Sequence, residues 1–251
     1  MNSVKDKNVL ITGGTRGIGA AISSLFADQG AKVSMIYKAD LESARTQLQS
    51  LAGKGHELYQ CDICNPKAIS QLYRQYSQAH DTLDILINNA GIAYHHPVDK
   101  TTYEEWQSSW SHIISTNLLA PSNMSYHAAH IMKAQGHGCI INISSRGAFK
   151  GEPMMPAYGA SKAALNSMTQ SLAFQLAPYN IRVGAIAPGF VETEMSRPRL
   201  EGKIGTNIKN QSPLTRVAQP QEVAEAAYLM AKSNIWMTGS VWDVNGASHF
   251  R

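Results

Sequence analysis

Residues 8–19 read NVLITGGTRGIG, and this stretch decides how the rest of the chain is interpreted. The apolar run Asn8–Thr12 leads into glycines at positions 13, 17 and 19, and a helical apolar period follows at once. Glycines allow a tight turn, and a new helix offers unpaired N–H groups and a positive dipole end. The glycine spacing differs from G-x-G-x-x-G, so the segment alone predicts either a phosphate-binding turn or a plain strand–helix connection.

Outward from this turn, short apolar runs alternate with amphipathic ones along the whole chain. Strands are expected at Asn8–Thr12, Lys32–Tyr37, Glu57–Gln60, Leu83–Asn88, Gly138–Ile143, Ile181–Ala187 and Val241–Val244. These runs are apolar on both faces, as strands covered by helices on both sides must be. The alternation predicts an α/β fold: a doubly wound, seven-stranded parallel sheet with helices on both faces. No linker, repeat or break in composition appears, so residues 1–251 are interpreted as a single domain.

The composition excludes several classes of protein. Apolar residues make up 43% and charged residues 16%, which excludes a disordered chain, and the net charge of +4 comes from scattered residues rather than a nucleic-acid-binding run. No apolar stretch is long enough to span a membrane. The N-terminus lacks a signal-peptide pattern, and the three cysteines fit a reducing compartment. We therefore expect a cytoplasmic protein with no nucleic-acid or membrane partner.

The end of the second expected strand bears on the choice of nicotinamide cofactor. A carboxylate there suits the ribose of NAD, and a cation suits the 2′-phosphate of NADP. Tyr37 and Lys38 occupy this place, and Arg16 lies in the glycine turn. These residues favour NADP (NADPH) over NAD, unless Asp40 is a displaced acid and Lys38 a solvated loop residue.

Tyr158 and Lys162 lie four residues apart, which places them on one face of a helix. Pro153 and Pro156 precede them, so Tyr158 lies near the N-terminus of that helix. A nearby ammonium and the positive helix end both favour the phenolate, so we expect the pKa of Tyr158 to fall. Such a tyrosine can act as a general acid or base, although a Tyr–Lys pair alone is usually a surface feature.

The motifs together resemble the short-chain dehydrogenase/reductase family, whose fold is of the Rossmann type. In order and spacing they are Thr12–Gly19, Asn88-Asn89-Ala90-Gly91, Asn117, Ser145, Tyr158-x-x-x-Lys162 and Pro188-Gly189. The resemblance covers essentially the whole chain. The segment PGFVETEM at 188–195 looks closest to 3-oxoacyl-(acyl-carrier-protein) reductases, a match that many reductases of other substrates share.

The resemblance implies four catalytic roles. Tyr158 would donate a proton to the carbonyl oxygen, and Lys162 would lower the pKa of Tyr158 and bind the nicotinamide ribose. Ser145, preferred over Ser144 by its spacing, would polarise the carbonyl. Asn117 would complete a proton relay through a water. No metal is expected, because the family needs none and the histidines and Cys61-x-x-Cys64 lack further ligands at metal-binding spacing.

The resemblance also implies the cofactor-binding residues. Asp62 and Ile63 would contact the adenine, and the segment after the sixth strand would flank the nicotinamide. The full set is Gly13, Thr15, Arg16, Gly17, Ile18, Gly19, Tyr37, Lys38, Asp62, Ile63, Asn89, Ala90, Gly91, Tyr158, Lys162, Pro188, Gly189, Val191 and Thr193.

These roles predict an NADPH-dependent oxidoreductase that reduces a ketone to a secondary alcohol. The expected substrate is a 3-oxoacyl thioester or a similar carbonyl compound, either a small molecule or bound to an acyl carrier. The alternatives are an NAD-linked alcohol or steroid dehydrogenase working oxidatively, and a non-catalytic dinucleotide-binding sensor. A polar substrate lid is expected at about 190–213. Arg146, where the family often has a small apolar residue, either meets an acidic substrate group or points to solvent.

Two helices carry further expectations. The helix of residues 160–177 has apolar side chains on two faces, so a partner subunit is expected to cover one of them, in a homodimer or homotetramer; the alternative is small alanines facing water. Pro121 removes the helix hydrogen bond to the carbonyl of Asn117. We therefore expect a kinked helix at this point, with the water of the proton relay bound to the free carbonyl of Asn117.

Overall fold

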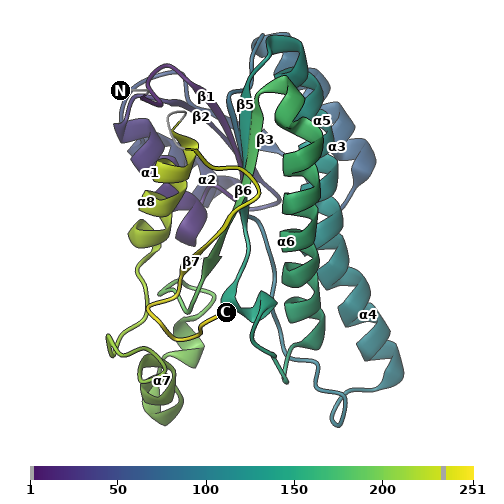
Figure 1. Cartoon of the computed structure of the whole chain (residues 1–251), viewed down its shortest axis with the longest axis vertical. Helices are drawn as coiled ribbons and strands as arrows, with labels where there is room; N and C mark the ends of the chain where they lie inside the picture. Colours follow the sequence, from purple (N-terminus) through teal and green to yellow (C-terminus); the bar gives the residue numbers. More distant parts are fainter. Residues whose placement is uncertain (1–2, 233–235) are drawn as a thin grey trace.

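A computed structural model of the chain describes residues 3–232 and 236–251, and it is built around one parallel sheet (Figure 1). The strands are β1 Asn8–Thr12, β2 Lys32–Tyr37, β3 Glu57–Gln60, β4 Ile85–Asn88, β5 Gly138–Ile143, β6 Ile181–Pro188 and β7 Val241–Val244. All neighbours pair in parallel in the order β3-β2-β1-β4-β5-β6-β7. The doubly wound seven-stranded sheet predicted from the sequence is confirmed.

Helices cover both faces of the sheet, and Figure 1 shows the two layers on opposite sides. Helices α1 and α8 pack together on one face, whereas α3, α5 and α6 cover the other. The α-helices are α1 Gly17–Asp28, α2 Leu41–Ser50, α3 Pro66–Ala79, α4 Tyr103–Ile114, α5 Ala120–Gln135, α6 Pro156–Leu176, α7 Gly202–Lys209 and α8 Pro220–Ala231. Shorter turns are η1 Ser115–Leu119, η2 Arg146–Ala148, η3 Ala177–Tyr179 and η4 Arg197–Arg199.

The strands are apolar on both faces because each face meets a helical layer. In β1, Val9 and Ile11 belong to the core beneath α1 and α8, while Leu10 belongs to the core beneath α3 and α5. All three side chains are fully buried. Alternate residues of a strand point to opposite faces, so this single strand contributes to both cores. The near-continuous apolar runs in the sequence are therefore the signature of the double cover.

The expected strand ends differ from the structure at two places. Strand β4 begins at Ile85 rather than Leu83, and β6 extends to Pro188. Asp84 precedes β4 and is 8% exposed. Its carboxylate accepts hydrogen bonds from Lys7 Nζ at 2.8 Å and from the backbone N–H of Asn8 at 2.8 Å, and it lies 3.0 Å from His137 Nε2. A buried acid with several partners, rather than an apolar strand residue, therefore precedes this strand.

The face of α6 opposite the core is exposed in the single chain. Phe174 is 87% exposed, and Ala160 and Ala163 are also exposed. An exposed face of this kind is compatible both with a subunit interface and with small alanines that face water. The expected homo-oligomer therefore stays a prediction. Among the described residues, no helix combines the length and apolarity needed to cross a bilayer.

Candidate active site

The turn between β1 and α1 is shaped to approach an anion. Gly13 and Gly17 adopt positive φ angles of 62° and 53°, which favour glycine. A Cβ at Gly19 would collide with the carbonyl of Gly13. Helix α1 has neither a side-chain cap nor an acidic residue in its first turn, so its N–H groups remain available. The turn therefore fits the pyrophosphate of a dinucleotide. Thr15, Ile18 and the exposed Arg16 lie in the same turn.

The Asn89–Gly91 segment holds this turn in place. The side-chain amide of Asn89 donates to the carbonyls of Thr12 and Gly13, at 3.0 Å each. The backbone N–H groups of Asn89 and Ala90 both donate to the Thr12 hydroxyl at 3.0 Å. These contacts join the ends of β1 and β4, the neighbouring strands where the order of the sheet reverses direction. A cleft at that point is where open α/β sheets bind ligands.

At the end of β2, the residues considered for cofactor choice have different partners. Lys38 forms an ion pair with Asp62 at 2.9 Å, between the ends of β2 and β3. Asp40 caps α2, and its carboxylate accepts from the backbone N–H and hydroxyl of Ser43. The acid at position 40 is therefore engaged in its own helix. Tyr37 and Ile63 lie beside the pair, partly buried.

Tyr158 lies in the first turn of α6, and Ser145 follows β5. The hydroxyl of Ser145 accepts from the N–H of Gly147 at 3.0 Å. Burial raises the pKa of Tyr158, and the hydrogen bond with Ser145 lowers it only in part. The expected fall in this pKa is therefore wrong for the protein alone, because desolvation outweighs the neighbouring charges. The hydroxyl of Ser144 instead faces the carbonyl of Lys162 at 3.4 Å.

Lys162 is 4% exposed, and its ammonium donates to the carbonyl of Ile143 at 2.8 Å. The Nζ atom lies 5.9 Å from the centre of the Tyr158 ring. Burial lowers the pKa of Lys162 to about 8. A Cβ at Gly91 would lie 3.4 Å from this Nζ, so the small residue leaves open the space beside the ammonium. A buried ammonium facing such a gap fits a ribose hydroxyl group.

Asn117 sits in η1, a π-helical turn between α4 and α5. Here the N–H of Ala120 donates to Ser115, and Pro121 has no N–H to donate to Asn117. The side chain of Asn117 accepts from the N–H of Ile92 at 2.9 Å and donates to Ile92 O and to Ser161 Oγ. The expected kink is thus a π-turn, which aims Asn117 at the helix that carries Tyr158 and Lys162.

His96 lies in the loop between β4 and α4, and it is 1% exposed. Its Nε2 accepts from the N–H of Ala157 at 3.1 Å, and its Nδ1 faces the carbonyl of Tyr94 at 2.9 Å. These partners require the neutral ring with its proton on Nδ1. His96 therefore satisfies a free N–H at the start of α6, next to Tyr158; the sequence offers no local signal for it.

The segment after β6 lies over the glycine turn. Pro188 is buried at the end of β6, and Val191 forms a bridge with Ala218. A Cβ at Gly17 would lie 3.4 Å from Thr193 Cγ2, so Thr193 packs against the turn. The carboxyl ends of parallel strands share one edge of a sheet, so the expected cofactor residues that follow β1, β2, β3, β4 and β6 lie along that edge. Helix α7 and η4 form the rest of the expected lid.

Arg146 does not point to solvent, because it is only 5% exposed. Its guanidinium stacks on Phe190, 4.8 Å from the ring centre, and donates to the side-chain oxygen of Gln211 at 2.7 Å. Burial lowers its pKa, the charge of Glu152 raises it and that of Arg199 lowers it. Of the two alternatives for this residue, the solvated one is wrong.

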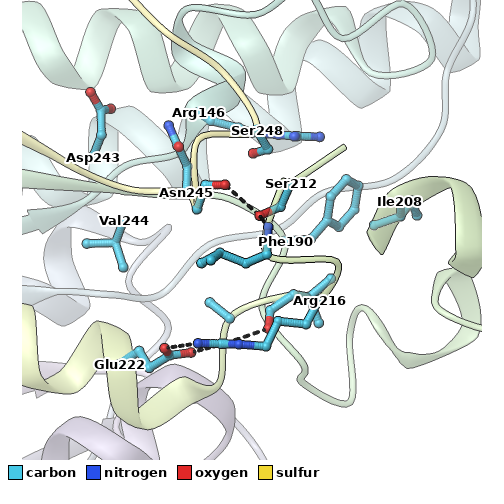
Figure 2. Close-up of a pocket in the computed structure, with 14 residues that line it drawn as sticks. Arg146, Phe190, Ile208, Ser212, Arg216, Glu222, Asp243, Val244, Asn245 and Ser248 are labelled. Atoms are coloured by element: carbon cyan, nitrogen blue, oxygen red, sulfur yellow. Dashed lines mark hydrogen bonds and ion pairs between the residues drawn. The ribbon is translucent and has the colours of Figure 1, made fainter. Parts of the chain in front are cut away.

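A cavity of about 190 Å³ lies beside the residues expected to be catalytic rather than around them. Figure 2 shows Arg146 at one end, Phe190 between, and the Arg216–Glu222 ion pair at the other end. Residues 243–248, which follow and include the end of β7, form another wall. Ser145, Tyr158 and Lys162 do not line it. Arg146 and Phe190 are therefore shared between this cavity and the end of β5 and β6.

The arrangement of the possible metal ligands can be compared with what a metal site needs. Within the described ranges 3–232 and 236–251, no three of the His, Cys, Asp and Glu residues gather as a metal would require. Cys61, Cys64 and Cys139 are free thiols, and Cys64 Sγ lies 3.2 Å from the hydroxyl of Thr116.

Comparison with known proteins agrees with this geometry. A model of the family described as enoyl-(acyl-carrier-protein) reductase matches residues 13–249. The chain is 33% identical to a 3-oxoacyl-(acyl-carrier-protein) reductase of Chlamydia trachomatis over 249 residues, 96% of each chain. It is 36% identical to a 3α-hydroxysteroid dehydrogenase of Mediterraneibacter gnavus over 255 residues, 98% of each.

Solved structures agree as well. A putative gluconate dehydrogenase of Agrobacterium tumefaciens superposes with a TM-score of 0.93 at 25% identity, covering 98% of this chain and 97% of that one. The structure of ElxO with NADP bound superposes with a TM-score of 0.88 at 27% identity, covering 97% and 98%. The chain belongs to the short-chain dehydrogenase/reductase family. Within that family it is an oxidoreductase, similar to 3-oxoacyl-(acyl-carrier-protein) reductases.

Proposed function

We propose that the protein is an NADPH-dependent reductase that converts a ketone, a 3-oxoacyl thioester or a similar carbonyl, to a secondary alcohol. The observation that carries the proposal is the convergence of Ser145, Tyr158 and a buried Lys162 ammonium beside the glycine turn. Bound NADPH supplies the hydride. The chain supplies the placement of the ketone and the proton.

Tyr158 donates the proton to the carbonyl oxygen as negative charge develops there. Its raised pKa keeps the hydroxyl protonated at neutral pH, which is the form that a reduction consumes. The Ser145 hydroxyl points at the same oxygen and polarises the carbonyl. The choice of Ser145 over Ser144 is supported by the contact of Ser144 with the carbonyl of Lys162.

Lys162 stabilises the phenolate that remains after proton transfer and binds the ribose of the cofactor. Its ammonium has Ile143 O as its acceptor, which leaves further N–H donors for these partners. The carbonyl of Asn117, four residues before Pro121, holds a water that returns a proton to Lys162. Pro121 supports this relay, because it has no N–H to donate to the Asn117 carbonyl.

NADPH is preferred over NADH by the charges around the adenine ribose. Arg16 is exposed at the start of α1, and Lys38 lies at the end of β2, so both can reach a 2′-phosphate. Asp40 caps its own helix, which removes the acid that would favour NAD. The relative whose structure holds NADP supports the same choice. Lys38 would exchange part of its pairing with Asp62 for the phosphate.

The proposal also covers the location of the enzyme, its oligomeric state, its lid and its domain organisation. The enzyme acts in the cytoplasm as a homodimer or homotetramer, with the exposed face of α6 as the contact between subunits. Residues 190–213 close over the substrate, and residues 1–251 act as one domain. A second candidate function, oxidation of an alcohol or steroid, is favoured by the similarity to a 3α-hydroxysteroid dehydrogenase.

Replacing Tyr158 with phenylalanine tests the proposal, because it removes one hydroxyl and keeps the ring. We expect the kcat/KM for ethyl acetoacetate with NADPH to fall by at least about 10³-fold, the range lost with a general acid. The Kd for NADPH should rise by less than about 10-fold, because at most one hydrogen bond to the cofactor is lost. Turnover in the variant close to that of the wild type would overturn the proposed role. A non-catalytic sensor would show no turnover in the wild type either.

A further inference from the structure

The guanidinium of Arg146, directly after Ser145, is a buried positive charge. Arg146 is 5% exposed, and no carboxylate in residues 3–232 or 236–251 lies within ion-pair distance of its guanidinium. Its hydrogen bond goes to the neutral side chain of Gln211, which also accepts from Lys150 at 3.4 Å. A buried charge without a counter-charge costs free energy, so a ligand that supplies one would be bound with a large gain.

A second guanidinium approaches the same aromatic ring. Arg199, in η4, lies 5.2 Å from the centre of Phe190, and Arg146 lies 4.8 Å from it. Arg199 also contacts the sulfur of Met155 at 3.8 Å, the residue whose carbonyl accepts from the N–H of Tyr158. Because η4 belongs to the substrate segment and Met155 to the start of α6, Arg199 joins the two sides of the site.

The charges of this cluster leave a positive excess next to the reacting atoms. Arg199 is close enough to both Tyr158 and Arg146 for its charge to lower the pKa of each. The negative charge of Glu152 has the opposite effect and raises the pKa of both Tyr158 and Arg146. Its carboxylate, however, packs against Gly147 and forms no ion pair with Arg146. Two guanidinium groups against one carboxylate leave one net positive charge, with Lys150 beside them.

We propose that Arg146 and Arg199 bind an anionic group on the substrate, so that the enzyme prefers oxo acids to neutral ketones. This inference rests on the proposed ketone reduction and names the chemical class of its substrate. The anion is a carboxylate or a phosphate, both of which match the planar fork of an arginine. Phe190 holds both guanidinium planes in position, and Gln211 orients that of Arg146.

The test compares matched charged and neutral substrates with NADPH. The carboxylate pairs are acetoacetate with ethyl acetoacetate and 4-oxopentanoate with its methyl ester; the phosphate pair is dihydroxyacetone phosphate with dihydroxyacetone. We expect the wild type to show a kcat/KM about 10- to 100-fold higher for the acid of at least one pair, as a charge-assisted hydrogen bond provides. The preferred pair identifies the anion.

Arg146→Met and Arg199→Met should each remove that preference by raising the KM for the charged substrate about 10-fold or more, with kcat/KM for the neutral partner changed less than about threefold. Arg199→Met keeps the test valid if Arg146→Met fails to fold, because Arg199 is only partly buried. Arg146→Lys should restore part of the preference. The matched control is Arg74→Met, an exposed arginine of α3 outside the site, which should behave as the wild type.

Equal rates for acids and esters in the wild type would overturn this inference, as would an equal loss for both in the two variants. Either result leaves the proposed reductase function intact, provided that Tyr158→Phe still abolishes reduction of the neutral ketones. Conversely, reduction that survives in Tyr158→Phe would overturn the catalytic assignment while leaving the charge preference measurable.

Discussion

The two edges of the sheet treat buried charge in opposite ways. At the edge where the strands begin, Asp84 is surrounded by partners: Lys7, the N–H of Asn8 and His137. At the edge where they end, Lys162 and Arg146 are buried with only neutral acceptors among the described residues. Pairing and hydrogen bonding offset the cost of burying a charge, whereas an unpaired buried charge retains that cost. At the edge where the strands begin, the partners of Asp84 offset the free energy of burying its charge. At the edge where the strands end, that free energy is not offset by a counter-charge in the described part of the chain, and a bound ligand could offset it.

The largest effect is expected for Lys162→Met, which removes an unpaired buried charge at the edge where the strands end. We expect kcat/KM to fall about 10²- to 10³-fold, as with other groups that assist proton transfer. The cofactor-free variant should be more stable at pH 7 by about 1–3 kcal/mol, since the lowered pKa of Lys162 measures the cost of burying its charge. Enzyme assays and urea unfolding check the two halves.

The pH dependence follows from the same pKa. Below pH 8 the buried ammonium carries its full cost, and above it the folded protein releases the proton first. Unfolding free energy of the wild type, relative to Lys162→Met, should therefore rise as the pH increases from about 8 towards 10.5. Lys67→Met, at an exposed position of α3, is the matched control. A less stable Lys162→Met protein would contradict the comparison.

The opposite result is expected for Asp84→Asn, at the edge where the strands begin. Burial raises the pKa of Asp84, but its hydrogen bonds with Lys7, Asn8 and His137 outweigh this and lower it. The variant should lose about 2 kcal/mol of unfolding free energy at pH 7 and keep its turnover. The wild-type advantage is present above the unfolded pKa of the carboxyl and disappears as the pH falls through the lowered folded value.

Asp81→Asn serves as the control for this experiment, because Asp81 is exposed three residues before Asp84. Urea unfolding at pH 7 and at about pH 3, below the ordinary pKa of an aspartate, measures the difference. A stability of Asp84→Asn equal to that of Asp81→Asn at pH 7 would show that the paired edge contributes nothing.

The smallest effect is expected at Arg16, in the glycine turn where the cofactor would bind. Arg16→Ala should raise the Kd for NADPH about 10-fold, equivalent to about 1.4 kcal/mol, and leave that for NADH unchanged. The reason is that a 2′-phosphate gains a charge-assisted hydrogen bond that a 2′-hydroxyl does not. Fluorescence titration of both nucleotides measures this, with the exposed Arg45→Ala as control. Equal weakening of both would place Arg16 on the pyrophosphate instead.

The fold could be predicted from the sequence because its determinants are local. Apolar runs such as Lys32–Tyr37 and the glycines at 13 and 17 fix strands and a turn without reference to distant residues. The candidate site residues could be named from their motifs, and the structure brings many of them to one edge of the sheet. Their roles in catalysis and cofactor binding remain proposals.

The contacts that tune the site could not be predicted, because they join residues far apart in the chain. His96 reaches Ala157, Lys162 reaches Ile143 O, and Lys38 turns to Asp62. The predicted direction of the pKa shift of Tyr158 was wrong for the same reason. The shift depends on how deeply the whole fold buries the ring. Pro121 indicated a bend but not its π-helical form.

The π-turn at Ser115–Leu119 has a consequence for the two helices that it joins. One surplus residue there rotates everything before it by about 100° relative to everything after it, the angle that a single residue subtends in an α-helix. Helix α4 can thus pack on α6 while α5 packs on α3 and the sheet. Deleting one residue from the turn would restore an unbroken spiral, and the side chains of one half would then face the wrong neighbours.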